Sequence, residues 1–263
     1  MQIAAVDIGN SSIKIAVEHS LDDRWSWETI IREPNLSELD HSKLHQNPDP
    51  VFWSVSSVNQ TRAARLAAWI AAQRPQDHFH LITPSEVDLE TAVRSRDRLG
   101  RDRLIAAWRA LQLNESGPLV VIDAGTAVTI DVVDENSIFQ GGIIFPGAAT
   151  MLRMLATQTD ALPDLSDRHI DSPTPLNLHS TSAYIGKSTE SAILLGVYQT
   201  QRCTLLAAVA ALSSGYSRAP DVYLTGGGAV ELLEWLPDVW QHVPDLVLQG
   251  ARNIGRTLLG TDA

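Results

Sequence analysis

Val120–Val133, with the sequence VVIDAGTAVTIDVV, decides the fold: an apolar run reaches an aspartate, passes a short polar turn and returns as a second β-rich run. Ala5–Val17, AVDIGNSSIKIAV, repeats the same order of apolar run, Asp, Gly, small polar residues and return. Each stretch predicts a β-hairpin. Because Asp7 and Asp123 lie close to half the chain apart, the repeat predicts two similar half-domains that each present a carboxylate and a small polar loop to a shared cleft.

The loop of the N-terminal hairpin has the composition of a phosphate site. Gly9 gives the backbone freedom to turn, and the successive N–H groups of Asn10, Ser11 and Ser12 can form an anion-binding concavity. Asp7 just before them is a candidate for holding Mg²⁺ against phosphate oxygens. An Asx turn in an ordinary hairpin would explain Asp7 alone. The second copy of the pattern favours the phosphate interpretation.

Composition limits the classes of protein and partner. The 263 residues are 44% hydrophobic, enough for two modest cores, and the formal net charge of −11 argues against binding a nucleic-acid backbone or an anionic membrane. Cys203 has no partner for an internal disulfide and is expected as a small buried residue rather than a reactive thiol. With no signal peptide and no run long enough to span a bilayer, the sequence predicts a soluble, cytoplasmic protein.

Hydrophobic periodicity predicts the remaining elements. A polar turn at Asn114–Pro118 marks the expected boundary between domains 1–114 and 115–263, with the C-terminal helix free to pack back on the first. In chain order the patterns predict strands and loops over 22–50, a strand Val51–Val55, a helix Gln60–Gln73, a strand His78–Ile82, a strand Ser137–Gly147, a loop over 162–177, a helix Ser188–Leu212, a strand Asp221–Thr225, a helix Ala229–Leu236, and a short strand and helix within Asp245–Leu258.

Asp102 has two competing explanations. The apolar positions that follow Gly100–Arg103 at helical spacing put Asp102 in the first turn of a helix. A carboxylate there is favoured by the helix dipole whatever the protein does. It would also serve as a general base, with Arg101 and Arg103 to attract an anionic substrate. Spacing alone does not separate the two.

Six motifs in chain order give the sequence a specific likeness. Paired Asp-led hairpins with a late Thr-Gly-Gly turn resemble the acetate kinase, sugar kinase, heat-shock 70 and actin superfamily, and within it the set resembles type III pantothenate kinases. The motifs are Asp7–Ser11, Gly100–Arg103, Asp123–Ala127, Gly141–Gly142 with Pro146–Gly147, Ile185–Thr189 and Thr225–Gly227. The resemblance implies an α/β fold of two ribonuclease H-like halves, each a mixed sheet flanked by helices, with a cleft between them.

The resemblance also implies an activity: ATP-dependent phosphorylation of the primary hydroxyl of pantothenate, the first step of coenzyme A synthesis. Asp102 would be the general base, and the substrate-binding residues would be Gly100, Arg101, Asp102, Arg103 and Thr189. The ATP phosphates would be bound by Asp7, Ile8, Gly9, Asn10, Ser11, Ser12, Ile13 and Lys14.

Cations and a second subunit are implied as well. Asp7 is expected near Mg²⁺, Thr126 at ATP, and Asp123 at a monovalent cation, K⁺ or NH₄⁺. The family resemblance further implies a homodimer with substrate sites at the subunit interface.

Two positions depart from the family pattern. Val93 stands where a tyrosine often contacts substrate, and Arg101 stands where a smaller apolar residue is common; solvation of Arg101 is the favoured interpretation. A non-catalytic regulator on the same scaffold and a kinase of another small hydroxylated substrate are the alternatives. The retained Asp7, Asp102, Arg103 and Asp123 argue against the regulator, which would need no base together with metal ligands.

Overall fold

The computed structural model describes residues 1–263 apart from 18–30, 34–48, 115, 168–184 and 261–263. Contacts divide the chain into two compact units: residues 1–113 with 245–263 form unit 1, and residues 114–244 form unit 2. The predicted strands and loops over 22–50 and the predicted loop over 162–177 lie largely outside the described residues.

Unit 1 is built on a mixed sheet. In its described residues, five strands lie in the order β3-β2-β1-β4-β5. β1, β2 and β3 are antiparallel neighbours, whereas β4 runs parallel to β1 and β5 parallel to β4. The strands are β1 (Gln2–Ile8), β2 (Ile13–Val17), β3 (Ile31–Glu33), β4 (Val51–Ser57) and β5 (His78–Leu81). The predicted N-terminal hairpin is therefore confirmed as β1–β2.

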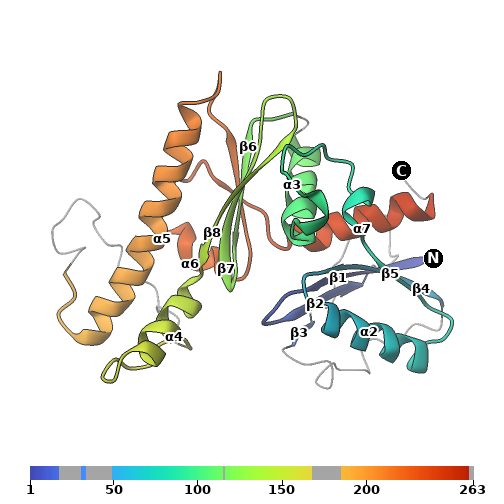
Figure 1. Ribbon diagram of the computed structural model, residues 1–263, viewed down its shortest axis with the longest axis horizontal. Helices are drawn as coiled ribbons and strands as arrows, with labels where there is room; N and C mark the ends of the chain where they lie inside the picture. The colour runs from blue at the N-terminus through green and yellow to red at the C-terminus, as the bar shows by residue number, and fades with distance from the viewer. Residues whose placement is uncertain (18–30, 34–48, 115, 168–184, 261–263) are drawn as a thin grey trace. The chain divides into compact units, whose positions relative to one another are not determined.

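Two helices cover opposite faces of this sheet, α2 (Gln60–Gln73) and α7 (Leu246–Leu259) (Figure 1). The α2 face is the apolar core, to which every second residue of β1 and β4 contributes: Ala4, Val6, Ile8, Val51, Trp53 and Val55. On the other face the Ser54 hydroxyl donates a 2.6 Å hydrogen bond to the carbonyl of Ala251 in α7. α7 packs closely there because Gly255 has no side chain: a Cβ would lie 3.1 Å from that of Ser54.

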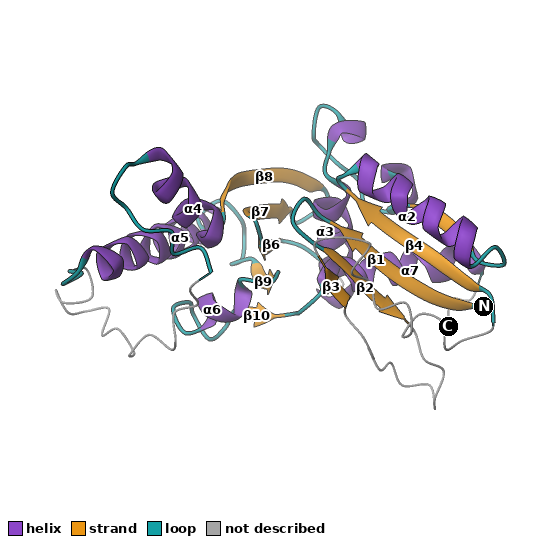
Figure 2. Ribbon diagram, turned by 90° about the horizontal axis from the view of Figure 1, so that it is seen from below, coloured by secondary structure: helices purple, strands orange, loops and turns teal. Residues whose placement is uncertain are grey.

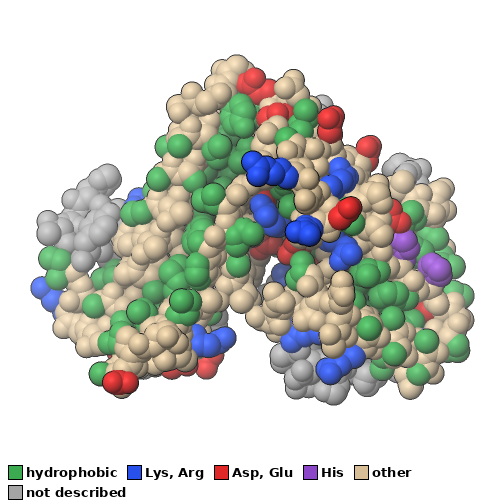
Figure 3. Space-filling view, in the orientation of Figure 1, with side chains coloured by type: hydrophobic (Ala, Val, Ile, Leu, Met, Phe, Trp, Pro, Cys, Tyr) green, Lys and Arg blue, Asp and Glu red, His purple; other side chains and the backbone are tan. Residues whose placement is uncertain are grey.

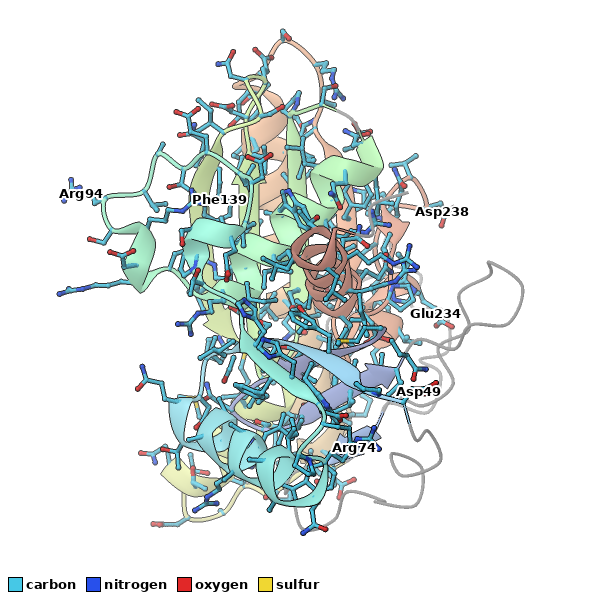
Figure 4. The ribbon with its side chains drawn as sticks, turned by 90° about the vertical axis from the view of Figure 1, so that its right-hand side faces the viewer. Asp49, Arg74, Arg94, Phe139, Glu234 and Asp238 are labelled. Carbon is cyan, nitrogen blue, oxygen red and sulfur yellow. The ribbon has the colours of Figure 1, made fainter. Side chains whose placement is uncertain are left out.

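A buried ion pair fixes the beginning of β4. Asp77 accepts hydrogen bonds from the Val51 backbone N–H (3.1 Å) and from Trp53 Nε1 (2.8 Å), and it pairs with Arg74 just after α2. Arg74 also donates to the carbonyl of Asp49, and Figure 4 labels both residues. The two charged side chains are 4% and 0% exposed, so each depends on the other for compensation.

From β5 the chain passes through two short 3₁₀ turns, η2 (Pro84–Glu86) and η3 (Arg96–Arg98), and enters α3 (Arg101–Asn114). Arg96 holds this connection together, because its guanidinium donates to the carbonyls of Pro84, Val87 and Leu89 at 2.6–3.2 Å. α3 packs against α7 within unit 1, where a Cβ on Gly250 would lie 2.5 Å from Ile105.

Unit 2 repeats the topology of unit 1. Its described strands lie in the order β10-β9-β6-β7-β8 (Figure 2). β6, β7 and β8 are antiparallel neighbours, and β9 and β10 follow in parallel. The strands are β6 (Leu119–Ala124), β7 (Ala127–Val133), β8 (Phe139–Pro146), β9 (Asp221–Thr225) and β10 (Gln241–His242). Two mixed sheets flanked by helices confirm the predicted fold class.

The helices of unit 2 are α4 (Ala148–Gln158), α5 (Thr189–Ser213) and α6 (Ala229–Leu233). α5 and α6 supply apolar side chains to one core with β6, β7 and β9, among them Tyr198, Leu205 and Leu232. At the beginning of β9, Asp221 accepts from Arg218 (2.8 Å) and from Asn114 (2.9 Å). This pair is 44% and 36% exposed, unlike the buried pair of unit 1.

Two local predictions are wrong. No strand opens the segment Asp245–Leu258, which is helical from Leu246 onward, because its apolar positions repeat at helical spacing through Gly250. Cys203 is exposed on α5 rather than buried, since the apolar side of that helix faces the core through Leu205 and Val209. Within the described part of the chain, no helix has the length and apolar character needed to cross a membrane.

Candidate active site

The first hairpin holds Asp7 at the end of β1. Asp7 pairs in register with Lys14 of β2, so both side chains lie on the α7 face, and Lys14 Nζ is 3.6 Å from the carboxylate of Asp245 at the beginning of α7. The turn is closed by a 3.0 Å hydrogen bond from the Gly9 N–H to the Ser12 carbonyl, and Arg62 of α2 donates to the Gly9 carbonyl at 3.2 Å. The loop is thus held by α2, and Lys14 beside Asp7 is held by the beginning of α7.

Not every residue of this loop presents its side chain to a ligand. Asn10 and Ser11 are exposed at the tip of the hairpin. Ile8 and Ile13 are 0% and 1% exposed in the core beside α2. These two predicted cofactor-binding residues therefore offer only their backbone groups, whereas the polar residues between them offer both.

The second hairpin is enclosed by backbone. The Gly125 N–H donates to the Ala127 carbonyl (3.0 Å), which repeats the closure seen at Gly9. Gly226, directly after β9, has φ +94°, and a Cβ there would overlap Asp123 Oδ1 and the carbonyl of Ala124. The glycine leaves the Asp123 carboxylate a cradle that any side chain would fill.

The loop residue Thr126 is held on its other side by the beginning of α4. Its carbonyl accepts from the Gly147 N–H (2.9 Å) and from the Thr150 hydroxyl (2.6 Å), while its side chain is exposed. The glycines of β8 allow a neighbouring backbone to approach closely. At Gly142 the neighbour is the backbone of β7, because a Cβ would overlap the carbonyl of Ile130.

Asp102 lies in the first turn of α3, as predicted. Its Oδ1 accepts a 2.8 Å hydrogen bond from the Arg103 N–H. Burial raises the pKa of the Asp102 carboxyl, against a smaller opposing effect of the Arg103 backbone and charge. Gly100 makes room for the carboxylate, since a Cβ there would lie 2.6 Å from Oδ1. A carboxylate held rigidly with a raised pKa suits a general base.

Arg101 is not simply solvated, which corrects the favoured interpretation from sequence. It is half-buried, and its Nη1 donates a 2.9 Å hydrogen bond to the carbonyl of Ser57 at the end of β4. Its Nε is buried and has no hydrogen-bond partner among the described residues. The guanidinium therefore ties the Gly100–Arg103 segment to the strand next to β1.

A local basic surface departs from the acidic balance of the whole chain. Figure 3 shows several Lys and Arg side chains over the region of α3. Between residues 94 and 103 the chain carries five arginines: Arg94, Arg96, Arg98, Arg101 and Arg103. Arg94 points outward from the connection that precedes α3 (Figure 4). This is the local exception that an anionic ligand needs in a protein of net charge −11.

Thr189 is the first residue of α5 and is exposed; Ser188 caps the helix by accepting from the Ser191 N–H at 3.2 Å. The structure brings Asp7, Lys14 and the Gly100–Arg103 segment together in unit 1. Asp123 and Thr126 belong to unit 2, as does Thr189. Val93, where the family often has tyrosine, is half-buried in the connection before η3.

Two polar residues beside Asp7 were missed from sequence. Asp245, the partner of Lys14, lies far away in the chain and carries no local signal. Ser56 at the end of β4 pairs in register with Asp7. The sequence did contain a signal for Ser56. The expected strand is apolar up to Val55 and then continues with two serines, and the end of a parallel strand lies beside the end of its neighbour, here β1.

The donor set suits a magnesium nucleotide. The part of the chain that the structure describes has no group of three or more His, Cys, Asp and Glu side chains that could hold a metal ion alone. Mg²⁺ is commonly bound by one or two carboxylates together with substrate phosphates, so isolated carboxylates beside anion-binding loops are the expected arrangement. Asp7 with the Gly9–Ser12 loop fits this requirement, and so does the Gly226 cradle around Asp123 for a further cation.

The sequence was then compared with known proteins. The family model of the type III pantothenate kinases matches residues 3–210. A type III pantothenate kinase of Desulfovibrio desulfuricans is 35% identical, covering 96% of this chain and 96% of that protein. One of Rhodopirellula baltica is 30% identical and covers 93% and 95%.

Solved structures show the same fold. A Campylobacter jejuni protein described as a Baf family transcriptional activator superposes with a TM-score of 0.59 at 22% identity, covering 99% of this chain and all of that one. A Sinorhizobium meliloti protein described as a 2-dehydro-3-deoxygalactonokinase gives 0.51 at 15% identity, covering 99% and 98%. At these identities the likeness concerns the fold alone, and it agrees with the predicted fold of two mixed sheets flanked by helices.

Proposed function

Because the chain belongs to the type III pantothenate kinase family, it is a pantothenate kinase of coenzyme A synthesis, and we propose that Asp102 is the general base of its reaction. Asp102 would accept the proton of the primary hydroxyl of pantothenate as that oxygen attacks the γ-phosphorus of ATP. The observation that carries this proposal is the half-buried Asp102 carboxylate, whose pKa burial raises and whose charge Arg103 favours.

The surroundings of Asp102 support the assignment in two ways. A general base works best when its pKa approaches the working pH, and burial moves this carboxyl in that direction. Arg103 and the hydrogen bond from its N–H keep the carboxylate charged before the transfer and hold its orientation. Arginines of the same segment would bind the carboxylate of pantothenate, for which their planar donors are suited.

The kinase uses ATP with a divalent metal, and we assign the phosphates to the first hairpin, from Asp7 to Lys14. Asp7 would hold Mg²⁺, while Lys14 and the N–H groups of Asn10, Ser11 and Ser12 would bind phosphate oxygens. Bound Mg²⁺ neutralises the charge that develops on the phosphoryl oxygens. The protein's own part is to orient the phosphates and exclude water.

Asp123 would hold a monovalent cation, K⁺ or NH₄⁺, and Thr126 would contact ATP. The support is the cradle at Gly226, which leaves the Asp123 carboxylate accessible to an ion where a side chain would block it. Thr189 would contact pantothenate from the beginning of α5.

We further propose a homodimer, as the resemblance implies, and a cytoplasmic location, with which one unpaired cysteine is compatible.

Asp102→Asn tests the base. It keeps the size and the hydrogen-bonding shape of the side chain but cannot accept the proton, so kcat is expected to fall about 10²–10⁴-fold. The KM for ATP and the unfolding temperature should stay close to the parent values. Asp97→Asn, which changes an exposed acid in η3 of the same segment, is the matched control and should keep full activity.

The pH profile gives the second readout. Because the pKa of Asp102 is raised, the parent enzyme should lose kcat/KM with falling pH at a higher pH than an ordinary aspartate would cause. This acid limb should be absent from the residual activity of Asp102→Asn. A variant that keeps a tenth or more of the parent turnover, with the same acid limb, would show that Asp102 is not the base.

A further inference from the structure

Ser56, the sixth residue of β4, carries a buried hydroxyl that makes no hydrogen bond within the described part of the chain. Its side chain is 0% exposed, and its Oγ has no hydrogen-bond partner among the described residues. A buried hydroxyl without a partner destabilises a fold relative to alanine, because it has given up its hydrogen bonds to water. Such a group is expected where it is needed for something other than stability.

The position of Ser56 indicates what it serves. β1 and β4 are parallel, and their register places Ser56 directly beside Asp7. The alternation along both strands puts Val6 and Val55 in the α2 core, so Asp7 and Ser56 share the opposite face, the one covered by α7. The unpartnered hydroxyl therefore neighbours the carboxylate that we assign to Mg²⁺.

Ser54 shows that the α7 face can satisfy a serine. Two residues earlier on the same strand and face, the Ser54 hydroxyl is equally buried but donates 2.6 Å to the Ala251 carbonyl. The missing partner of Ser56 is thus a property of that one position. Immediately after it, the Ser57 carbonyl receives Arg101 of the substrate segment, so the end of β4 lies between the two proposed binding segments of unit 1.

We propose that Ser56 is a positioning residue for the magnesium nucleotide, acting through Asp7. When the nucleotide and its metal bind, the Ser56 hydroxyl donates a hydrogen bond to one oxygen of the Asp7 carboxylate and leaves the other directed to the cation. The inference rests on the proposed role of Asp7. It explains why the strand keeps a buried hydroxyl to which the described residues offer no hydrogen bond.

Two substitutions on one strand separate this role from a structural one. Ser56→Ala should unfold at the parent temperature or above it, since it removes an unsatisfied polar group. Its affinity for a non-hydrolysable ATP analogue with Mg²⁺, measured by titration calorimetry, should fall about tenfold, as for other groups that orient metal ligands. Affinity for the same analogue without metal should stay unchanged, and Ser56→Thr should restore binding.

Ser54→Ala is the matched control, because it removes a buried hydroxyl that does have a partner. It should lower the unfolding temperature and leave the effect of Mg²⁺ on analogue binding unchanged. If Ser56→Ala is destabilised as Ser54→Ala is, or if it binds the magnesium analogue as the parent does, the proposal is overturned.

Asp7→Asn distinguishes the two levels of the argument. If Asp7→Asn loses the magnesium-dependent affinity and Ser56→Ala does not, the assignment of Asp7 stands and only the Ser56 proposal fails. If Asp7→Asn keeps that affinity, the assignment of Asp7 is wrong. In the double variant, Ser56→Ala should add no further loss, because its effect passes through Asp7.

Discussion

The two hairpins share a backbone plan and differ in what surrounds the carboxylate. Asp7 and Asp123 each end the central strand of a five-stranded sheet with the same order and the same parallel and antiparallel neighbours. In both, a glycine N–H closes the turn onto the returning strand. Beside Asp7 the neighbouring strand β4 ends in Ser56 and Ser57, whereas beside Asp123 the neighbouring strand β9 ends in Thr225 and leads directly into Gly226.

This difference teaches how a duplicated scaffold can divide its work. The topology fixes where the two carboxylates lie. The end of the parallel strand beside each carboxylate, and the residue that follows that strand, decide which groups surround it. The buried Ser56 lies beside Asp7. Thr225 lies beside Asp123, and Gly226 after it leaves space next to the carboxylate. One plan thus places a hydroxyl residue beside each carboxylate, and the glycine turn adds an open cradle around Asp123.

The largest expected effect is a loss of stability. It contrasts the buried ion pair beside the beginning of β4 with the exposed ion pair at the beginning of β9. Asp77→Ala should destabilise unit 1 by about 3–5 kcal/mol, because it leaves Arg74 buried without its partner. Asp221→Ala should cost below about 1 kcal/mol, because Arg218 is 44% exposed and water replaces the carboxylate. Urea unfolding followed by tryptophan fluorescence measures both, and equal losses would contradict the contrast.

The next effect separates the two cations. Asp7→Asn should lower kcat by about 10²–10³-fold and raise the Mg²⁺ concentration needed for half-maximal rate, since a divalent ion contributes several kcal/mol to stabilising the transferred charge. Asp123→Asn should instead raise the K⁺ requirement, with a loss of about tenfold at fixed K⁺. Titrations of each cation at a saturating level of the other check this. If both variants shift only the Mg²⁺ curve, the proposed division is wrong.

The smallest effect contrasts the glycines. Gly226→Ala should cost about 2–3 kcal/mol, because its φ of +94° disfavours a side chain and the Cβ would overlap Asp123. Gly9→Ala should change stability by less than about 1 kcal/mol, since its Cβ would meet only the Ser12 carbonyl at 3.5 Å. Thermal unfolding compares the pair. A Gly9 variant as unstable as the Gly226 variant would show that the first loop is equally enclosed.

The backbone plan was largely readable from the sequence. Both hairpins follow from alternating apolar runs around Asp and Gly, and α2 has the bounds that its periodicity and Pro75 predict. The five-stranded order of each sheet was not readable, because the parallel pairing of β1 with β4 and of β6 with β9 depends on contacts between distant segments. The strand expected near Asp245 was wrong. The apolar residues there do repeat at helical spacing, but Gly250 interrupts the pattern, because the close packing of α7 on α3 leaves no room for a side chain at that position.

The candidate site was predictable only where a motif carries it. Asp7, Asp102 and Asp123 stand out in the sequence because each belongs to a motif. The burial that raises the pKa of Asp102 could not be predicted, since it arises from tertiary packing. The partners of site residues were equally hidden. Asp245 reaches Lys14 across most of the chain, and Arg101 reaches the Ser57 carbonyl rather than water.

The return of α7 to the first sheet has a consequence for synthesis on the ribosome. Unit 2 is one continuous segment, whereas unit 1 consists of residues 1–113 and 245–263. A chain made from its N-terminus can therefore complete unit 2 while the α7 face of unit 1, which includes Asp7 and Ser56, still lacks its cover. The proposed nucleotide-binding hairpin, Asp7 to Lys14, would then be the last part of the protein to reach its final fold, although it is synthesised first.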